Sequence, residues 1–161
     1  MFFPVMATTK DGIDASHAAM ILSQAALAAT VSIPVAGHLI DRFRLDPTLV
    51  YIVTFGFGSA LSLGLPYAPG YALTSAIMAI FLMGDAIHHL TAPMILTRIE
   101  GKERLATTYS FTTTFRNVGT MIGPFVFGIL LDLNIDNRIL WLAWPIPGLL
   151  ACIFIALTKI G

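Results

Sequence analysis

Four ionisable side chains interrupt two long apolar stretches of the chain: Asp85, His88 and His89 in one, and Arg116 in the next. An ionisable side chain inside a lipid bilayer costs several kcal/mol, so these residues are functional candidates by default. The spacing i, i+3, i+4 places Asp85, His88 and His89 on one face of a helix. A carboxylate beside two imidazoles can bind a solute or coupling ion, or relay a proton, because histidine titrates near neutral pH.

Arg116 is the natural partner of Asp85. Asp85 lies twelve residues before Thr97, and Arg116 lies twelve residues after Arg104. If the chain turns back between Thr97 and Arg104, both side chains lie roughly 18 Å from the turn. We therefore expect a salt bridge at the bilayer midplane in one state, opened by a solute or a proton in another. A permanent buried pair that fixes the helix register is the alternative.

Other readings of these polar residues stay open. Asp85, His88 and His89 supply three metal ligands, but the remaining histidines, His17 and His38, lie at opposite expected membrane edges, so we expect no metal. The plainer alternative is that the polar side chains line a wet cavity or bond to the next helix. Asn117 adds a hydrogen-bonding group beside Arg116 and joins the candidate binding residues.

The composition is that of a membrane protein. The 161 residues are 57% hydrophobic and 11% charged, whereas soluble domains carry roughly 25% charged residues. Basic and acidic residues balance at nine each, which argues against nucleic acid as a partner. No G-x-S-x-G, phosphate-loop or cofactor motif is present, so we expect neither an enzyme nor a bound cofactor.

Five stretches are long enough to cross a bilayer, which takes about 20 mostly apolar residues. They cover residues 18–40, 47–66, 71–96, 105–131 and 139–158. No segment between them is long enough to hold a soluble domain. The sequence therefore predicts an all-α, multipass transmembrane helical bundle, with residues 1–161 as a single membrane domain.

Lys and Arg predict the orientation in the membrane, because cytoplasmic loops carry an excess of them. One side carries six, namely Arg42, Arg44, Arg98, Lys102, Arg104 and Lys159, and the other carries only Lys10 and Arg138. We expect the first side, with the C-terminus, to be cytoplasmic. Residues 1–7 are apolar and are expected to be the tail of one more helix; a short surface peptide is the alternative.

A glycine and two charged residues, Gly37, Asp41 and Arg42, end the first span in the pattern G-x-x-x-D-R. Gly101-Lys102-Glu103-Arg104 follows the third span, and Gly119-x-x-x-Gly123-Pro124 lies in the fourth. In this order the motifs resemble the C-terminal half of the monocarboxylate-transporter-like branch of the major facilitator superfamily. The resemblance covers helices eight to twelve and the end of helix seven, so the chain is expected to be a partial half of such a transporter.

The resemblance implies roles for these motifs. The loop with Gly37, Asp41 and Arg42 is expected to gate the conformational change through charged contacts on the cytoplasmic side, with Asp41 near Arg98 or Arg104. An ordinary solvated turn is the alternative. Gly119 and Gly123 are small residues four apart, which let helix backbones approach closely, so helix packing is their expected role.

The implied function is secondary active transport of a small organic solute by alternating access. A monocarboxylate is one candidate, although the family's acid and arginine positions in helix eight are Ala29 and Ile33 here. Expected partners are the lipid bilayer, the solute, and the missing N-terminal half or another transporter chain; the plasma membrane is the default location. The alternatives are a non-transporting fragment or ancillary subunit that associates with another transporter, and, remotely, a histidine-dependent membrane enzyme.

Overall fold

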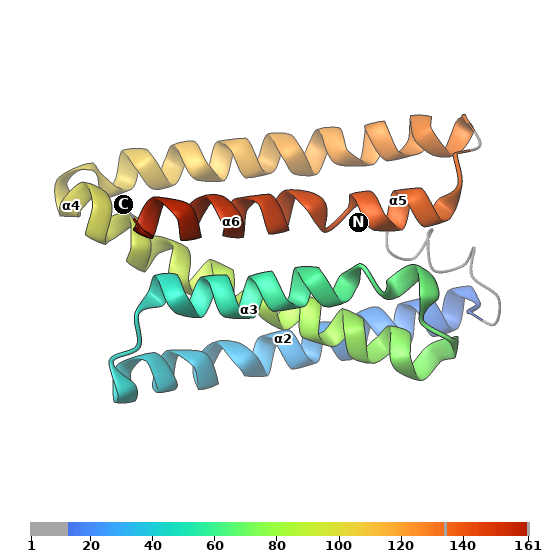
Figure 1. Ribbon diagram of the computed structural model, residues 1–161, viewed down its shortest axis with the longest axis horizontal. Helices are drawn as coiled ribbons and strands as arrows, with labels where there is room; N and C mark the ends of the chain where they lie inside the picture. The colour runs from blue at the N-terminus through green and yellow to red at the C-terminus, as the bar shows by residue number, and fades with distance from the viewer. Residues whose placement is uncertain (1–12, 134, 161) are drawn as a thin grey trace.

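The computed structural model describes residues 13–133 and 135–160, and the elements of this part of the chain are all helices (Figure 1). Within the described ranges, five segments are long and apolar enough to cross a membrane. They are Ala15–Phe43, Pro47–Tyr67, Gly70–Ile99, Arg104–Asp132 and Arg138–Thr158. The predicted all-α bundle and its five spans are thus confirmed, with ends that differ by a few residues. The predicted helix tail at residues 1–7 lies outside the described residues, and a single membrane domain stays a prediction.

Helix α2 (Ala15–Phe43) begins with a side-chain cap and ends in a left-handed residue. The carboxylate of Asp14 accepts hydrogen bonds from the His17 backbone N–H at 2.7 Å and from the Ser16 hydroxyl at 2.8 Å. The backbone hydrogen bond, more than the neighbouring hydroxyl, lowers the pKa of Asp14 below its usual range. Arg44 adopts φ 50° at the other end, a conformation that costs a non-glycine residue roughly 1–2 kcal/mol and turns the chain toward the next helix.

Helix α3 (Pro47–Ser62) starts at once after this turn, and the short 3₁₀ helix η1 (Leu65–Tyr67) follows it. Asp46 is the N-cap of α3, and its side chain accepts a hydrogen bond from the Thr48 N–H at 2.8 Å. Pro47 occupies the first helical position, where its missing N–H costs nothing. The Asp-Pro pair therefore explains why the second span begins at this residue.

Helix α4 (Gly70–Asp132) contains both the third and the fourth predicted spans. The sequence predicted a break between Thr97 and Arg104, whereas the backbone stays helical there. A straight helix of 63 residues would be far longer than the roughly 30 Å of a bilayer core. Figure 1 shows instead that α4 turns back on itself in its yellow segment. We call residues 70–99 the first arm of α4 and residues 104–132 its second arm.

The fifth predicted span is divided into α5 (Asn137–Ala143) and α6 (Ile146–Ile160). The division falls at Trp144 and Pro145. Proline has no N–H to donate and its ring clashes with the preceding turn, so Pro145 explains why the helix is interrupted here.

The first arm of α4 packs against both α2 and α3, and α6 packs against α3. A buried cluster joins α2, η1, the first arm of α4 and α5 at one end of the bundle. It consists of Ile13, Ala18, Ile21, Ala25, Leu65, Ala68, Ile77, Met78, Leu140 and Trp141. This cluster fixes the end of the bundle opposite the basic loops.

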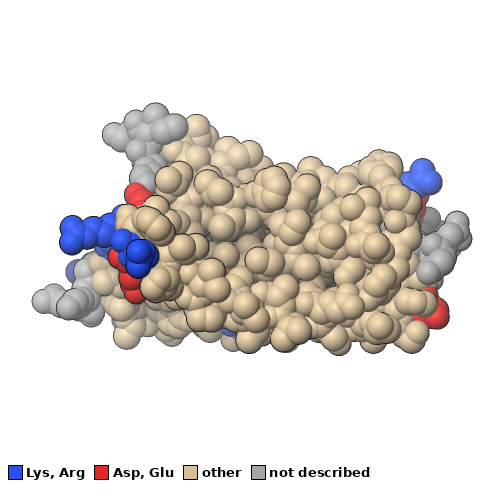
Figure 2. All heavy atoms as spheres, turned by 90° about the horizontal axis from the view of Figure 1, so that it is seen from below, with Lys and Arg blue, Asp and Glu red and all other residues tan. Residues whose placement is uncertain are grey.

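The charged side chains gather at the two ends of the molecule. On the face in Figure 2, Lys, Arg, Asp and Glu lie at the left and right ends, and the broad belt between them is nearly free of charge. This is the distribution that a bilayer requires. The second arm of α4 has no buried residue in its most apolar stretch, so one large apolar face lies open to lipid or to another helix.

Candidate functional site

The side chains of Asp85, His89 and Arg116 form a chain of polar contacts between the two arms of α4. Nη1 of Arg116 lies 3.1 Å from Nδ1 of His89, and Nε2 of the same ring lies 3.6 Å from Oδ2 of Asp85. The ion pairs found among the described residues do not include Asp85 with Arg116. In this arrangement the imidazole of His89, one helical turn after Asp85, lies between the two charges, and a direct salt bridge in another state stays a prediction.

The contact with Arg116 determines where His89 carries its proton. A guanidinium has donors only, so Nδ1 of His89 must be the acceptor. This assignment, made from donor geometry, leaves the ring proton on Nε2, which faces Asp85. The ring is neutral in this arrangement. A hydrogen on Nδ1 would instead face the donors of Arg116, so the contact with Arg116 requires the tautomer with its proton on Nε2.

His88 lies on the other side of the polar chain, against aromatic rings of α3. Its ring centroid is 5.0 Å from that of Tyr51 and 5.4 Å from that of Phe55. Nδ1 of His88 is buried without a hydrogen-bond partner among the described residues, while the His88 and His89 rings are 5.2 Å apart. No group of three or more His, Cys, Asp or Glu in the described part of the chain is arranged to hold a metal ion.

A cavity of about 510 Å³ lies next to Asp85. Its wall comes from α3, both arms of α4 and the break between α5 and α6. The lining residues are Phe55, Ser59, Phe81, Asp85, Gly119, Thr120, Gly123, Pro124, Phe127, Ala143, Trp144, Pro145, Pro147 and Gly148. Asp85 is the one ionisable residue in this lining, and it belongs to the predicted set; Ser59 and the aromatic residues were not predicted.

Ser59 is a polar group that the sequence alone did not single out. The residue is 0% exposed, and its Oγ has no hydrogen-bond partner among the described residues. The residue lines the cavity beside Asp85. A buried hydroxyl without a partner costs about 1–3 kcal/mol, so a group that enters the cavity and bonds to Ser59 recovers part of that cost.

Two glycines that were not predicted hold α3 against the first arm of α4. A Cβ at Gly84 would lie 2.7 Å from the backbone oxygen of Thr54, and a Cβ at Gly58 would lie 3.1 Å from Cα of Phe81. The distance at Gly84 is shorter than Cβ atoms show and the one at Gly58 is tighter than most, so the two backbones approach most closely at Gly84, where only glycine fits. Gly84 immediately precedes Asp85, and this close approach sets the carboxylate at the cavity wall. The available signal was the position of Gly84 directly before an intramembrane acid.

The predicted packing glycines and Asn117 occupy different surroundings. Nothing in the described part of the chain lies within 4 Å of a Cβ built at Gly119 or Gly123, and both residues line the cavity. A packing role for this pair thus needs a helix outside the described residues, and it stays a prediction. Asn117 is exposed and is not in the cavity lining, so its predicted part in binding stays a prediction.

The charged contact at the basic end of the bundle involves a different acid from the one expected. Nη1 of Arg98 lies 3.1 Å from Oδ1 of Asp46, across 52 residues of sequence. Asp41, which we expected near Arg98 or Arg104, is exposed, and Arg42 lies over the ring of Phe43 at 6.0 Å. Among the described residues Arg98 pairs with Asp46 and no ion pair of Asp41 is found, so the gating role of Asp41 stays a prediction. A Cβ at Gly37 would make ordinary contact with Leu90 at 3.8 Å.

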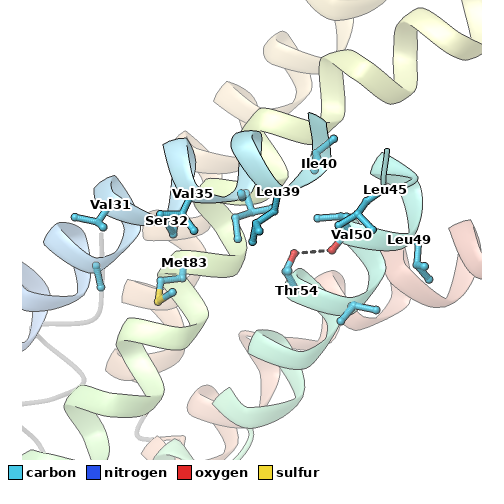
Figure 3. A pocket seen from close by; sticks show the side chains of 14 residues that line it. Val31, Ser32, Val35, Leu39, Ile40, Leu45, Leu49, Val50, Thr54 and Met83 are labelled. Carbon is cyan, nitrogen blue, oxygen red and sulfur yellow. Dashed lines mark hydrogen bonds between the residues drawn. The ribbon is translucent and has the colours of Figure 1, made fainter. Parts of the chain in front are cut away.

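A second cavity, of about 600 Å³, lies between α2, α3 and the first arm of α4 (Figure 3). Its lining contains no charged residue, and its hydroxyl groups are already used. Thr54 donates to the Val50 carbonyl and Ser32 donates to the Ala29 carbonyl, both at 2.7 Å. With no polar group left to orient a solute, this cavity suits hydrocarbon, and the cavity at Asp85 is the better candidate site.

Residues 1–160 match the family described as Major Facilitator Superfamily. No curated protein and no solved structure matches the chain. The match covers nearly all of the sequence and includes every residue of the site described above. It supports the superfamily indicated by the sequence motifs and leaves the monocarboxylate-transporter-like branch unconfirmed.

Proposed function

The chain belongs to the major facilitator superfamily, a family of transporters rather than enzymes, and on this premise we propose that it moves a small organic solute by secondary active transport. The solute site is the cavity beside Asp85. The observation that carries this proposal is a carboxylate on the wall of an otherwise uncharged cavity, linked through His89 to Arg116. Transporter sites lie near the bilayer midplane, where the depths of Asp85 and Arg116 also fall.

We infer that His89 couples the solute to protons. With neutral His89, Asp85 is available to the solute; with protonated His89, the carboxylate has a positive partner on its own helix. The other ionisable groups around the pair are His88 on the same arm, Arg116 on the second arm and Tyr51 on α3. A solute and a proton therefore compete for one carboxylate, which is the minimum requirement for coupling their movements.

Alternating access requires one half of the transporter to rock against another. We propose that an N-terminal half, or another transporter chain, supplies the opposing half. The open face of the second arm of α4 supports this, because it includes large exposed side chains. Phe115, Met121 and Phe125 are each more than two-thirds exposed, at 72%, 72% and 71%.

We also propose that the protein lies in the plasma membrane. The end with Arg42, Arg44 and Arg98 then faces the cytoplasm, together with the C-terminus. The support is the excess of Lys and Arg on this side. The contact between Asp46 and Arg98 is consistent with this, since it joins two of the basic connections at one end.

A monocarboxylate is the solute that the sequence resemblance favours. Its carboxylate would need a cation at the cavity wall, but Arg116 is outside the lining and contacts His89. Ala29 and Ile33, at the helix-eight positions of the family's acid and arginine, also provide no charge.

The proposed transport is tested by uptake into proteoliposomes prepared from cells that express the full chain together with the proposed opposing half. Phenyltrimethylammonium, benzoate and benzyl alcohol serve as labelled solutes, with and without a proton gradient. We expect the gradient to change the uptake of at least one solute by about fivefold or more. Replacing His89→Gln, which stays neutral, is expected to remove this response. Absence of uptake for every solute would favour a chain that only associates with another transporter.

Breaking the contact at the basic end is expected to slow transport without changing which solute is preferred. Asp46→Asn and Arg98→Gln each remove one side of a partly exposed pair, for which we expect a loss of at most about fivefold in rate. The double variant should be no slower than either single variant, because both remove the same contact. Asp41→Ala is the matched comparison and tests the gating role predicted for that residue. A changed solute preference at a normal rate would contradict the prediction.

A further inference from the structure

We propose that the cavity beside Asp85 takes an organic cation, an ammonium group carried on an aromatic or apolar body. The inference rests on the proposed function, since it assigns a substrate class to the same cavity. It does not follow from the sequence motifs, which favour a carboxylate.

The charges around the cavity favour a cationic solute. Asp85 is the one ionisable residue in the lining, and no Lys, Arg or His lines the wall with it. Arg116 lies outside the lining and its guanidinium points at His89. A carboxylate solute would therefore meet a carboxylate of like charge in a region of low dielectric constant, where repulsion is strong. A cationic solute would be attracted by the same group.

The aromatic residues of the cavity wall also favour a cation. Phe55, Phe81, Phe127 and Trp144 all line the cavity with Asp85. The rings of Phe81 and Trp144 meet edge to face, with centroids 5.3 Å apart, so they form one continuous patch. Aromatic faces attract ammonium groups, and tryptophan does so most strongly. An aromatic wall with one carboxylate is a combination that suits a quaternary or protonated amine.

The size and the remaining polar group of the cavity fit the same class of solute. Sites for small molecules usually measure about 300–1,000 Å³, and this cavity measures about 510 Å³. The hydroxyl of Thr120 is already bonded to the Arg116 carbonyl at 2.9 Å. The Oγ of Ser59 is fully buried, so Asp85 is the polar group that the wall offers to the cation.

The test measures binding to the purified full chain by tryptophan fluorescence, since Trp144 lines the cavity while Trp141 lies in the buried cluster. The probes are phenyltrimethylammonium, tert-butylbenzene, which has the same shape without the charge, and benzoate. We expect the cation to bind at least about tenfold more tightly than either of the others. Asp85→Asn should remove most of this preference, and Asp132→Asn, at an exposed acid at the end of α4, should leave it unchanged.

A second variant keeps the test decisive if Asp85→Asn does not fold. Phe81→Leu keeps an apolar wall but removes one ring. It should therefore weaken the binding of the cation about fivefold and leave the binding of tert-butylbenzene nearly unchanged. The inference would be overturned if benzoate bound more tightly than phenyltrimethylammonium, or if tert-butylbenzene bound as tightly as this cation. It would also be overturned if the cation did not bind at all. If benzoate or benzyl alcohol is then transported under a proton gradient, the proposed function stands and only the substrate class fails.

Discussion

Replacing Gly84→Val is expected to destabilise the bundle by about 3 kcal/mol. The first atom of the new side chain would lie 2.7 Å from the backbone oxygen of Thr54 and 3.2 Å from Cα of Phe55. Backbone atoms cannot rotate away as the end of a side chain can, so α3 must separate from the first arm of α4. The separation would also displace Asp85, the next residue, from the cavity wall.

This prediction can be measured through the lone cysteine. Cys152 is the only cysteine of the chain and is 5% exposed, so a maleimide dye that reacts on unfolding reports the melting temperature of the purified chain. Gly128→Val is the matched control, because nothing in the described part of the chain lies within 4 Å of a Cβ at Gly128. An equal melting temperature for Gly84→Val and the original chain would show that α3 and α4 do not approach closely at this point.

Replacing Arg116→Leu is expected to reduce transport by about 10- to 100-fold. The change leaves Nδ1 of His89 without its donor and removes the nearest cation from Asp85. A hydrogen bond to a charged group is worth about 1.5–3 kcal/mol, and the lower part of this range applies because Arg116 is exposed on its own arm. The measurement is the initial rate of solute uptake into proteoliposomes at equal protein content.

Two further variants separate the causes of such a loss. Arg138→Leu, at an exposed arginine near the other membrane edge, should leave the uptake rate unchanged and controls for loss of a positive charge. The exchange Asp85→Arg with Arg116→Asp keeps both charges but places an arginine at the cavity wall. Normal transport by this double variant would rule out direct contact of either residue with the solute.

The site shows how a small change in protonation can act across the bundle. His89 contacts an arginine 27 positions away in sequence through one ring nitrogen and faces the acid on its own helix through the other. Its protonation would release Arg116 on the second arm of α4, which packs loosely in this chain. His89 thus contacts both arms of α4, which is the position that the proposed coupling requires.

Much of the fold followed from the sequence because local composition is sufficient for it. A stretch of about 20 apolar residues must form a helix in lipid, since every backbone polar group needs a partner within the segment. The five spans follow from this rule. The superfamily was also evident from short motifs, and the family match over residues 1–160 agrees with it.

The tertiary structure decided which of the candidate residues meet. Helical spacing places Asp85, His88 and His89 on one face, but it does not say which of them a neighbouring helix will contact. That choice depends on how far each helix is rotated and how closely it approaches. At Gly58 and Gly84 the backbones of α3 and α4 touch, and this contact directs His88 toward α3 while His89 remains free to reach Arg116. The sequence also did not predict the charge of the cavity, because its wall is assembled from segments far apart in the sequence.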